Sequence, residues 1–288
     1  MKVFGLIAVL GALLGTATFP AVSLAQESTH DAAAPLTGGM DVGNPPFALT
    51  EPSGELVGFS IDLAKALATK LGRPGFEPID TNFGAIFAGL FAGRYEMITG
   101  TTNITAERAE QMLFSEPYLP TGLIFMVKSG TAFSAVEELK GKELAVNNGG
   151  VADKWATENA EALGFTVQRY NKNDDSVQAV LTGRAFAQLG DTPISRYIAS
   201  KAPTLALVDL LESTRAFGFA FRLEDEAFRD TVEVALECLK QEGYLAELHV
   251  KWFGTEPPAG DPSITVYPGY GAPGFAHFRE STDTQVCS

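Results

Sequence analysis

The sequence is poor in the residues that build metal sites and the familiar catalytic centres. Its three histidines, His30, His249 and His277, stand far apart, and its two cysteines do not form a C-x-x-C pair. It has no H-E-x-x-H, no aspartate-rich calcium loop, no G-x-S-x-G elbow and no glycine-rich dinucleotide or P-loop fingerprint. These absences argue against a metal, a cofactor and the familiar enzyme classes, so we expect neither metal nor cofactor.

Basic residues are also scarce. The chain has 21 lysines and arginines against 35 acidic residues. Without Lys2, which lies in the leader discussed next, the balance is 20 against 35, a formal charge of −15. Such a charge argues against nucleic acid or an anionic membrane surface as a partner. It does not argue against a small ligand, because the groups around a site decide what that site binds.

Long hydrophobic runs are absent beyond the N-terminal leader. There, Lys2 precedes the apolar run Val3–Leu14, and Ser23-Leu24-Ala25 has the small-x-small pattern of a cleavage site. Glycine, threonine and proline interrupt the run before it reaches the ~20 residues of a membrane span, which makes an anchor the weaker alternative. We therefore expect residues 1–25 to be a signal peptide and the protein to be exported to the periplasm.

Only two cysteines are present, Cys238 in a predicted helix and Cys287 next to the C-terminus. In an oxidising compartment such a pair can form a disulfide, which would tie the end of the chain to the helix. Two unrelated thiols are the alternative. We expect the disulfide.

The pattern of apolar residues predicts strands that alternate with helices, which is typical of parallel sheets with helices on both faces. The pattern breaks near Ser129 and then restarts. Two sets of this kind indicate two α/β lobes with a ligand crevice where strand ends meet. Residues 255–288 are rich in proline and glycine and lack periodicity, so we expect an extended tail that packs on the surface or is partly disordered.

The most informative stretch is Thr99–Arg108, T-G-T-T-N-I-T-A-E-R. It follows a predicted buried strand and leads into a short helix with Thr105 as N-cap. Arg108 then lies in the first helical turn, where the helix dipole disfavours a cation. An anion site would compensate, since a guanidinium pairs bidentately with a carboxylate and threonine hydroxyls lie beside it. Alternatively, Arg108 pairs with Glu107 or Glu110 on a solvated face.

Several sequence blocks in the same order resemble the extracytoplasmic solute-binding proteins, family 3, of ABC transporters for polar amino acids. The resemblance extends from about Leu36 to Gly254. The blocks are D-V-G-N-P-P-F (41–47), G-E-L-V-G-F-S-I-D-L-A (54–64), N-F-G-A-I (82–86), G-R-Y-E (93–96), T-A-E-R (105–108), F-S-E-P-Y (114–118), L-K-G-K (139–142) and K-W-F-G (251–254).

The resemblance implies a type II periplasmic-binding-protein fold, with residues 34–128 as the first part of lobe 1, 129–214 as lobe 2 and 215–254 returning to lobe 1. It also implies a small zwitterionic or carboxylate ligand that is captured by closure of the lobes about a hinge. A membrane permease of an ABC importer would then recognise the closed form. We expect a monomer.

The resemblance also implies the roles of individual residues. Arg108 would bind the α-carboxylate of the ligand, with Thr101 and Asn103 as neighbouring contacts. Phe83 would pack on the ligand, and Asp191 in the second lobe would take the α-ammonium. From the residues alone, the alternatives are that Phe83 belongs to the core and that Asp191 caps the helix that follows it, and we favour ligand contact for both.

Two positions depart from the family pattern. Asn44 stands where an aromatic residue is usual, and Gly149-Gly150-Val151 replaces a loop of the Gly-Thr-Thr type. Backbone N–H groups at Gly150 can still meet a carboxylate at the start of the next helix. Asp41, Asn44 and Gly150 complete the expected ligand contacts.

Three functional hypotheses follow. The first is a periplasmic receptor that delivers a small amino acid or related carboxylate to an ABC importer. The second is a periplasmic enzyme on the same scaffold, of the type that dehydrates a cyclic acid. The third is an accessory or sensor protein that has lost transport. We favour the receptor and expect no enzymatic activity.

Overall fold

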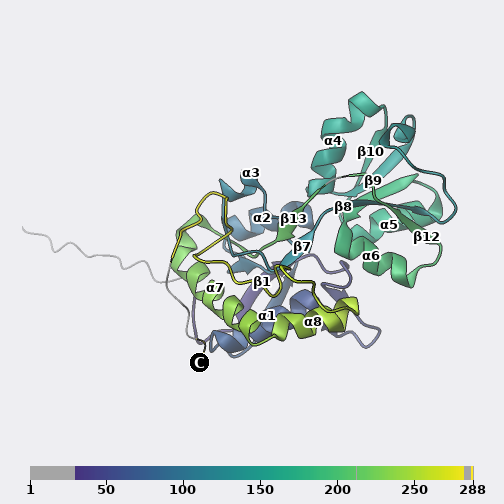
Figure 1. Ribbon diagram of the computed structural model, residues 1–288. Helices are drawn as coiled ribbons and strands as arrows, with labels where there is room; N and C mark the ends of the chain where they lie inside the picture. The colour runs from purple at the N-terminus through teal and green to yellow at the C-terminus, as the bar shows by residue number, and fades with distance from the viewer. Residues whose placement is uncertain (1–29, 212, 282–286, 288) are drawn as a thin grey trace, which may run out of the picture.

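The computed structural model describes residues 30–211, 213–281 and 287. The predicted signal peptide, residues 1–25, lies outside this part of the chain. Two five-stranded sheets form two lobes that are flanked by helices and joined by a pair of antiparallel strands (Figure 1). The structure thus has the two-lobed α/β architecture expected from the sequence. The helices that it describes include none with the length and apolar character to cross a bilayer.

The sheet of the first lobe has the strand order β4-β1-β5-β14-β6. Its strands are β1 (Leu36–Met40), β4 (Phe76–Asp80), β5 (Met97–Ile98), β6 (Leu113–Phe114) and β14 (Ala220–Phe221). β1 contains Gly38 and Gly39, which are poor strand formers. A Cβ atom at Gly39 would lie 2.4 Å from Cζ of Tyr95. The glycines are therefore required by close packing on this strand.

Helices surround this sheet and bury their apolar faces on it. They are α1 (Phe59–Lys70), α2 (Phe83–Phe91), α3 (Ala106–Ala109), the 3₁₀ turn η2 (Leu223–Asp225), α7 (Glu226–Gln241) and α8 (Tyr244–Phe253). A small hairpin, β2 (Leu49–Thr50) with β3 (Leu56–Val57), precedes α1. Leu63 of α1, Leu236 of α7 and Leu245 of α8 share one hydrophobic core, which joins the two ends of the sequence in one lobe.

The second lobe has the strand order β10-β9-β11-β8-β12. Its strands are β8 (Leu123–Lys128), β9 (Glu143–Asn147), β10 (Thr166–Tyr170), β11 (Ala187–Asp191) and β12 (Leu205–Val208). Its helices are η1 (a 3₁₀ turn, Val136–Leu139), α4 (Val151–Leu163), α5 (Asn173–Thr182) and α6 (Thr192–Lys201). This lobe has its own core, with Phe125, Val146 and Leu189 at its centre.

The expected lobe boundary at residue 129 needs correction. Strand β8 pairs with β11 and β12, so Leu123–Lys128 belongs to the sheet of the second lobe. Ser129-Gly130 is a turn inside that lobe. The apolar sequence of β8 would suit a buried strand in either lobe. Only its hydrogen-bonding partners assign it to the second lobe.

The two lobes are joined by strands β7 (Leu119–Thr121) and β13 (Arg215–Phe217). They pair in antiparallel register, with Arg215 opposite Thr121 and Phe217 opposite Leu119. β14 then enters the first sheet beside β5 and β6. Because the chain passes between the lobes in these two short strands, they form the natural hinge for closure.

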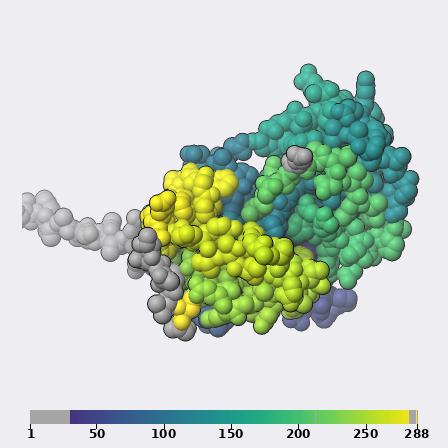
Figure 2. Space-filling model, in the orientation of Figure 1, coloured from purple at the N-terminus to yellow at the C-terminus, as the bar shows by residue number. Residues whose placement is uncertain are grey.

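The tail, residues 255–288, runs along the first lobe in its described part. In Figure 2 it covers one face of that lobe. No helix or strand is formed by residues 255–281, which make one isolated bridge between Tyr270 and Arg279. Cys287 is bonded to Cys238 of α7, which confirms the expected disulfide. The tail is thus attached to the lobe at its end as well as packed along it.

Candidate functional site

A small cavity lies between the lobes where the carboxyl ends of β5, β9 and β11 meet. It encloses about 30 Å³. Its lining comes from both lobes: Asn44, Phe83, Thr101 and Asn103 from the first, and Asn147, Gly150, Val151, Ala152, Asn173, Leu189, Gly190, Asp191 and Ile194 from the second. Polar groups on both sides therefore converge on one small space.

Six of the eight residues that we expected to contact a ligand line this cavity. They are Asn44, Phe83, Thr101, Asn103, Gly150 and Asp191. The other two, Asp41 and Arg108, lie at its edge and contact the opposite lobe directly. The structure thus brings residues more than 100 positions apart to one site.

Asp191 is the one titratable side chain among the residues that line the cavity. It occupies the N-cap position of α6, but its side chain makes no capping hydrogen bond. Its Oδ1 instead accepts from Asn103 Nδ2 of the first lobe at 2.9 Å and from Thr121 Oγ1 of the hinge at 3.4 Å. Burial raises the pKa of this carboxyl, and the bond from Asn103 and the charge of Arg108 oppose that shift. The carboxylate therefore has capacity for a further cation.

Three amide oxygens around the cavity are buried and have no donor in the described part of the chain: Oδ1 of Asn44, Asn103 and Asn147. Asn103 donates its amide to Asp191, and Asn147 donates to Asp41 Oδ2 at 3.4 Å. Because a carboxylate accepts hydrogen bonds and does not donate them, these two contacts fix which amide atom is the oxygen. The free oxygens of Asn103 and Asn147 are therefore acceptors that a ligand with N–H groups can satisfy.

Arg108 lies in the first lobe, beside the cavity-lining residue Asn103. As predicted, Thr105 caps the short helix α3, and its hydroxyl accepts from the backbone N–H of Arg108 at 3.3 Å. The guanidinium donates to the carbonyl of Asn103 at 3.0 Å and to that of Gly149 in the other lobe at 3.2 Å. Burial lowers its pKa to about 10, at which it still carries its charge at neutral pH.

Phe83 begins helix α2 and faces both the core and the site. Its ring packs edge-on against Phe87, with centroids 5.5 Å apart. The guanidinium carbon of Arg108 lies 5.4 Å from the Phe83 ring and 4.8 Å from the Phe87 ring. The two rings therefore hold the cation in place through cation–π contacts. The alternative pairing of Arg108 with Glu107 is not formed, because Glu107 pairs with Lys154 of the second lobe.

The N-terminus of α4 points at the cavity from the second lobe. Gly150, Val151 and Ala152 line the cavity at this helix end. The carboxylate of Asp153 accepts from the N–H of Gly149 at 3.0 Å and holds the loop in place. Since the first N–H groups of a helix have no partner within it, this end can bind a carboxylate.

Direct contacts hold the two lobes together beside the cavity. Lys172 Nζ lies 2.6 Å from Asp41 Oδ1 and 2.8 Å from Asp80 Oδ1. Burial raises the pKa of Asp41, and the hydrogen bond from Lys172 opposes this shift. A Cβ atom at Gly84 would lie 2.9 Å from Nδ2 of Asn148 in the other lobe. The structure is therefore a closed form in which Gly84 permits the close approach.

The second-lobe lining was largely missed by sequence reasoning. Asn147 ends strand β9 and Asn173 begins helix α5, yet neither belongs to a recognisable motif. Their position at the carboxyl ends of predicted strands could have identified them, since ligands in open α/β sheets bind there.

Comparisons with known proteins agree with this geometry. The sequence profile of the bacterial extracellular solute-binding proteins, family 3, matches residues 36–255. The chain is 28% identical over 223 residues to an arginine-binding periplasmic protein of Mannheimia haemolytica, covering 75% of this chain and 90% of that protein. It is 29% identical over 222 residues to the L-cystine-binding protein TcyJ of Escherichia coli (strain K12), covering 76% of this chain and 82% of that protein.

Solved structures of this kind superpose closely. An ancestral arginine-binding protein bound to arginine has a TM-score of 0.74 at 30% identity, covering 78% of this chain and all of that one. The ancestral amino acid-binding protein AncCDT-1, a precursor of cyclohexadienyl dehydratase, has a TM-score of 0.71 at 31% identity, covering 76% of this chain and 96% of that one.

Proposed function

Because the chain belongs to the bacterial extracellular solute-binding proteins, family 3, we propose that it captures one amino acid between its lobes and delivers it to an ABC importer. The named relatives are periplasmic amino-acid-binding proteins. The observation that carries the proposal is the half-buried carboxylate of Asp191, which lines the small cavity and accepts a hydrogen bond from Asn103 of the first lobe. Export to the periplasm, a permease partner and a monomeric state belong to the same proposal.

The ends of the amino acid would be bound by opposite charges. Asp191 and the free oxygen of Asn103 would accept from the α-ammonium. The carboxylate would meet Arg108 and the N–H groups at the start of α4. In the closed form Arg108 donates to backbone carbonyls, which are weaker partners than a carboxylate. A carboxylate that enters the opened cleft would therefore compete well for the guanidinium.

The side chain of the amino acid would carry N–H donors. The free oxygens of Asn44 and Asn147 are buried acceptors, and leaving them unpaired costs about 1–3 kcal/mol each. An apolar side chain would leave that cost in place, whereas an amide or guanidinium group would remove it. The cavity is lined by one aromatic ring, that of Phe83. Hydrogen bonds, more than ring stacking, would therefore select the side chain.

A ligand panel tests this function. We expect L-arginine or L-glutamine to raise the melting temperature and to bind in calorimetry, while L-norleucine, of similar length and without donors, does not. An arginine analogue that lacks the α-amino group should bind weakly, because it leaves Asp191 unpaired. Equal binding of L-norleucine would contradict the side-chain assignment. Absence of binding across all amino acids would contradict the receptor function itself.

The similarity to a dehydratase precursor raises an enzymatic function as the second candidate. We propose that this chain is not such an enzyme. General acid–base chemistry needs a titratable group poised for proton transfer, and in this proposal Asp191, the one such side chain that lines the cavity, is occupied by the ammonium of the ligand. Incubation with cyclic carboxylic acids and product analysis provides the test, and turnover that disappears in Asp191→Asn would overturn this conclusion.

A further inference from the structure

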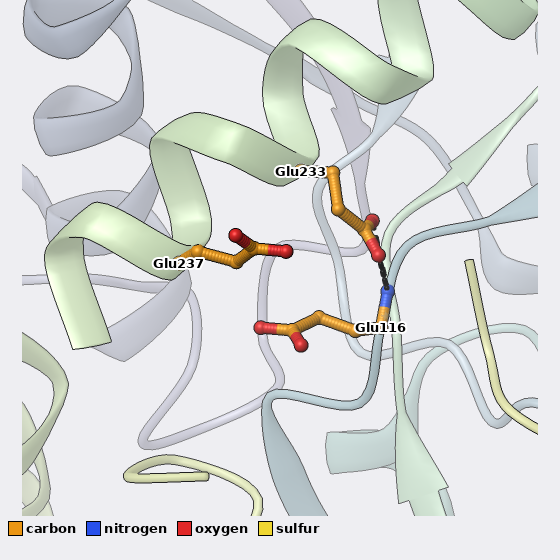
Figure 3. A group of neighbouring side chains, drawn as sticks. All are labelled: Glu116, Glu233 and Glu237. Carbon is orange, nitrogen blue, oxygen red and sulfur yellow. Dashed lines mark hydrogen bonds between the residues drawn. The ribbon is translucent and has the colours of Figure 1, made fainter. Parts of the chain in front are cut away.

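A buried cluster of charged groups lies away from the ligand site, under the tail. It consists of Glu233, Glu237 and Lys240 on α7, and of Glu116 on the loop that follows β6. One oxygen of each of the three carboxylates lies within 4.8 Å of the others. Figure 3 shows the two helix carboxylates and that of Glu116 directed toward a common space. All four side chains are at least 95% buried.

Backbone groups of the tail form hydrogen bonds with this cluster. The backbone N–H of Tyr267 donates to Glu116 Oε2 at 2.8 Å, and that of Gly271 donates to Glu233 Oε1 at 2.8 Å. Lys240 Nζ donates to the carbonyl of Thr265 at 2.9 Å. We call residues 265–276 the strap. Three of its backbone groups are therefore held by the charged cluster.

The strap continues into the core beneath the ligand site. Ala272 is 3% exposed and lies in a hydrophobic cluster with Ile86 of α2 and Ile98 of β5. Phe275 and Ala276 pack against the same cluster. Since α2 begins with Phe83 and β5 leads to Thr101, the strap supports the elements that carry the first-lobe contacts.

The charges of the cluster do not balance when every group is ionised. Lys240 pairs with Glu116 at 2.6 Å and also donates to the carbonyl of Pro117 at 2.7 Å, so that its three N–H groups are fully used. Glu233 accepts from the N–H groups of Glu116 and Gly271. Among the described residues, no group donates a hydrogen bond to the buried carboxylate of Glu237. With every group ionised, the three carboxylates and Lys240 would carry two net negative charges in a largely buried site.

We propose that the strap is held by a proton-dependent clasp, in which Glu237, together with Glu233, carries a proton while the strap is closed and loses it when the strap opens. Protons remove this excess charge, which the nearby guanidinium of Arg229 offsets only in part because it also pairs with Asp230. The inference is independent of which ligand the cleft binds.

The groups that face the cluster determine the direction of the pH response. Burial, and then the charge of Glu116, raise the pKa of Glu237 to about 7, against an opposing effect of Lys240. Burial and Glu116 raise the pKa of Glu233 to about 8, with Arg229 opposing. From the tail, Tyr267 and Asp261 add further acidic groups nearby.

Because these pKa values lie above the ordinary value of 4.5, protonation favours the closed strap. The closed strap is fully stabilised below about pH 4.5 and loses this stabilisation as the pH rises through about 7 to 8. The disulfide of Cys238 keeps the end of the tail attached, so an open strap remains a loop on the lobe.

Hydrogen exchange of the full-length protein tests the clasp. The exchange rates of the Tyr267 and Gly271 amides measure opening of the strap directly, because these amides donate to the clustered carboxylates. After correction for the intrinsic rate, we expect their protection to fall about tenfold or more between about pH 6 and about pH 9. In Glu237→Gln only the transition of Glu233 remains, so the fall in protection over this range should be smaller than in the unmodified protein and centred near pH 8. Glu242→Gln, which alters an exposed carboxylate at the end of the same helix, should follow the unmodified protein.

Three results would overturn the clasp. They are protection that does not depend on pH, a transition in Glu237→Gln equal to that of the unmodified protein, and full protection restored at about pH 9 by millimolar calcium chloride. The last result would make the cluster a cation site. Should Glu237→Gln fail to fold, Glu233→Gln supplies the same test, with the remaining transition expected near the pH at which Glu237 titrates.

Discussion

Replacement of Asp191 by asparagine separates the charge of this side chain from its shape. In the structure Asp191 is half-buried at the cleft, accepts from Asn103 at 2.9 Å and lies where a ligand ammonium would meet the second lobe. Asparagine keeps an oxygen for the bond from Asn103, but it removes the negative charge. The variant therefore tests the electrostatic part of ligand capture alone.

The expected effect on affinity is large. Loss of one partner from a buried, hydrogen-bonded charge pair costs about 2–5 kcal/mol. Since asparagine retains one acceptor, we expect the lower part of this range, about 2–3 kcal/mol. At about 1.4 kcal/mol for each factor of ten, this corresponds to a loss of affinity of roughly 30- to 150-fold.

The stability of the unliganded protein should respond differently. Burial raises the pKa of Asp191, so the ionised carboxylate is unfavourable in the folded state without a ligand. A group with a raised pKa loses stabilisation as the pH rises, and asparagine removes this dependence. We therefore expect the melting temperature of unliganded Asp191→Asn to equal or exceed that of the unmodified protein at neutral pH.

Calorimetric titration and thermal unfolding of the same preparations give both quantities. Asp209→Asn, at an exposed position in the second lobe, is a matched control that should change neither. An affinity within about threefold of the unmodified protein would refute the assignment of Asp191 to the ammonium. A large loss of unliganded stability would show that the carboxylate is structural.

Three further variants test the site and the tail. Arg108→Ala should remove most ligand binding and leave the circular dichroism spectrum unchanged, and unchanged affinity in calorimetry would contradict its role as the carboxylate partner. Gly84→Val should push Asn148 away and prevent full closure, lowering affinity about tenfold or more, whereas Gly75→Ala, where the added methyl meets open space, should bind normally. Cys238→Ala opens a covalent loop with a sequence separation of 49. It should lower the free energy of unfolding by about 2–4 kcal/mol in denaturant titrations, and a change below about 0.5 kcal/mol would show that the tail is held by packing alone.

The sequence predicted the local chemistry of the first lobe well. Thr105 was placed as an N-cap, and the short helix with Arg108 in its first turn followed from it. A capping residue acts on N–H groups within three positions, so neighbours along the chain suffice to predict it. The disulfide was expected from the compartment, although only the folded tail brings Cys287 beside α7.

The assignment of β8 to a lobe illustrates what local pattern leaves open. Its apolar residues indicate a buried strand, and they are equally suited to either sheet. Antiparallel pairing with β11 and β12 depends on residues about 60 to 85 positions away. The lobe boundary is therefore a property of long-range pairing.

By itself the sequence determined the fold class, the alternation of strands and helices, and the residue types that can bind a zwitterion. Hydrophobic periodicity and capping depend on residues a few positions apart, so they can be predicted directly from the sequence. Only the tertiary structure decided that Arg108 reaches across to Gly149, that asparagine oxygens surround the cavity unpaired, and that the tail closes over buried glutamates. These features depend on which groups are removed from water together, and that is settled only when distant segments pack.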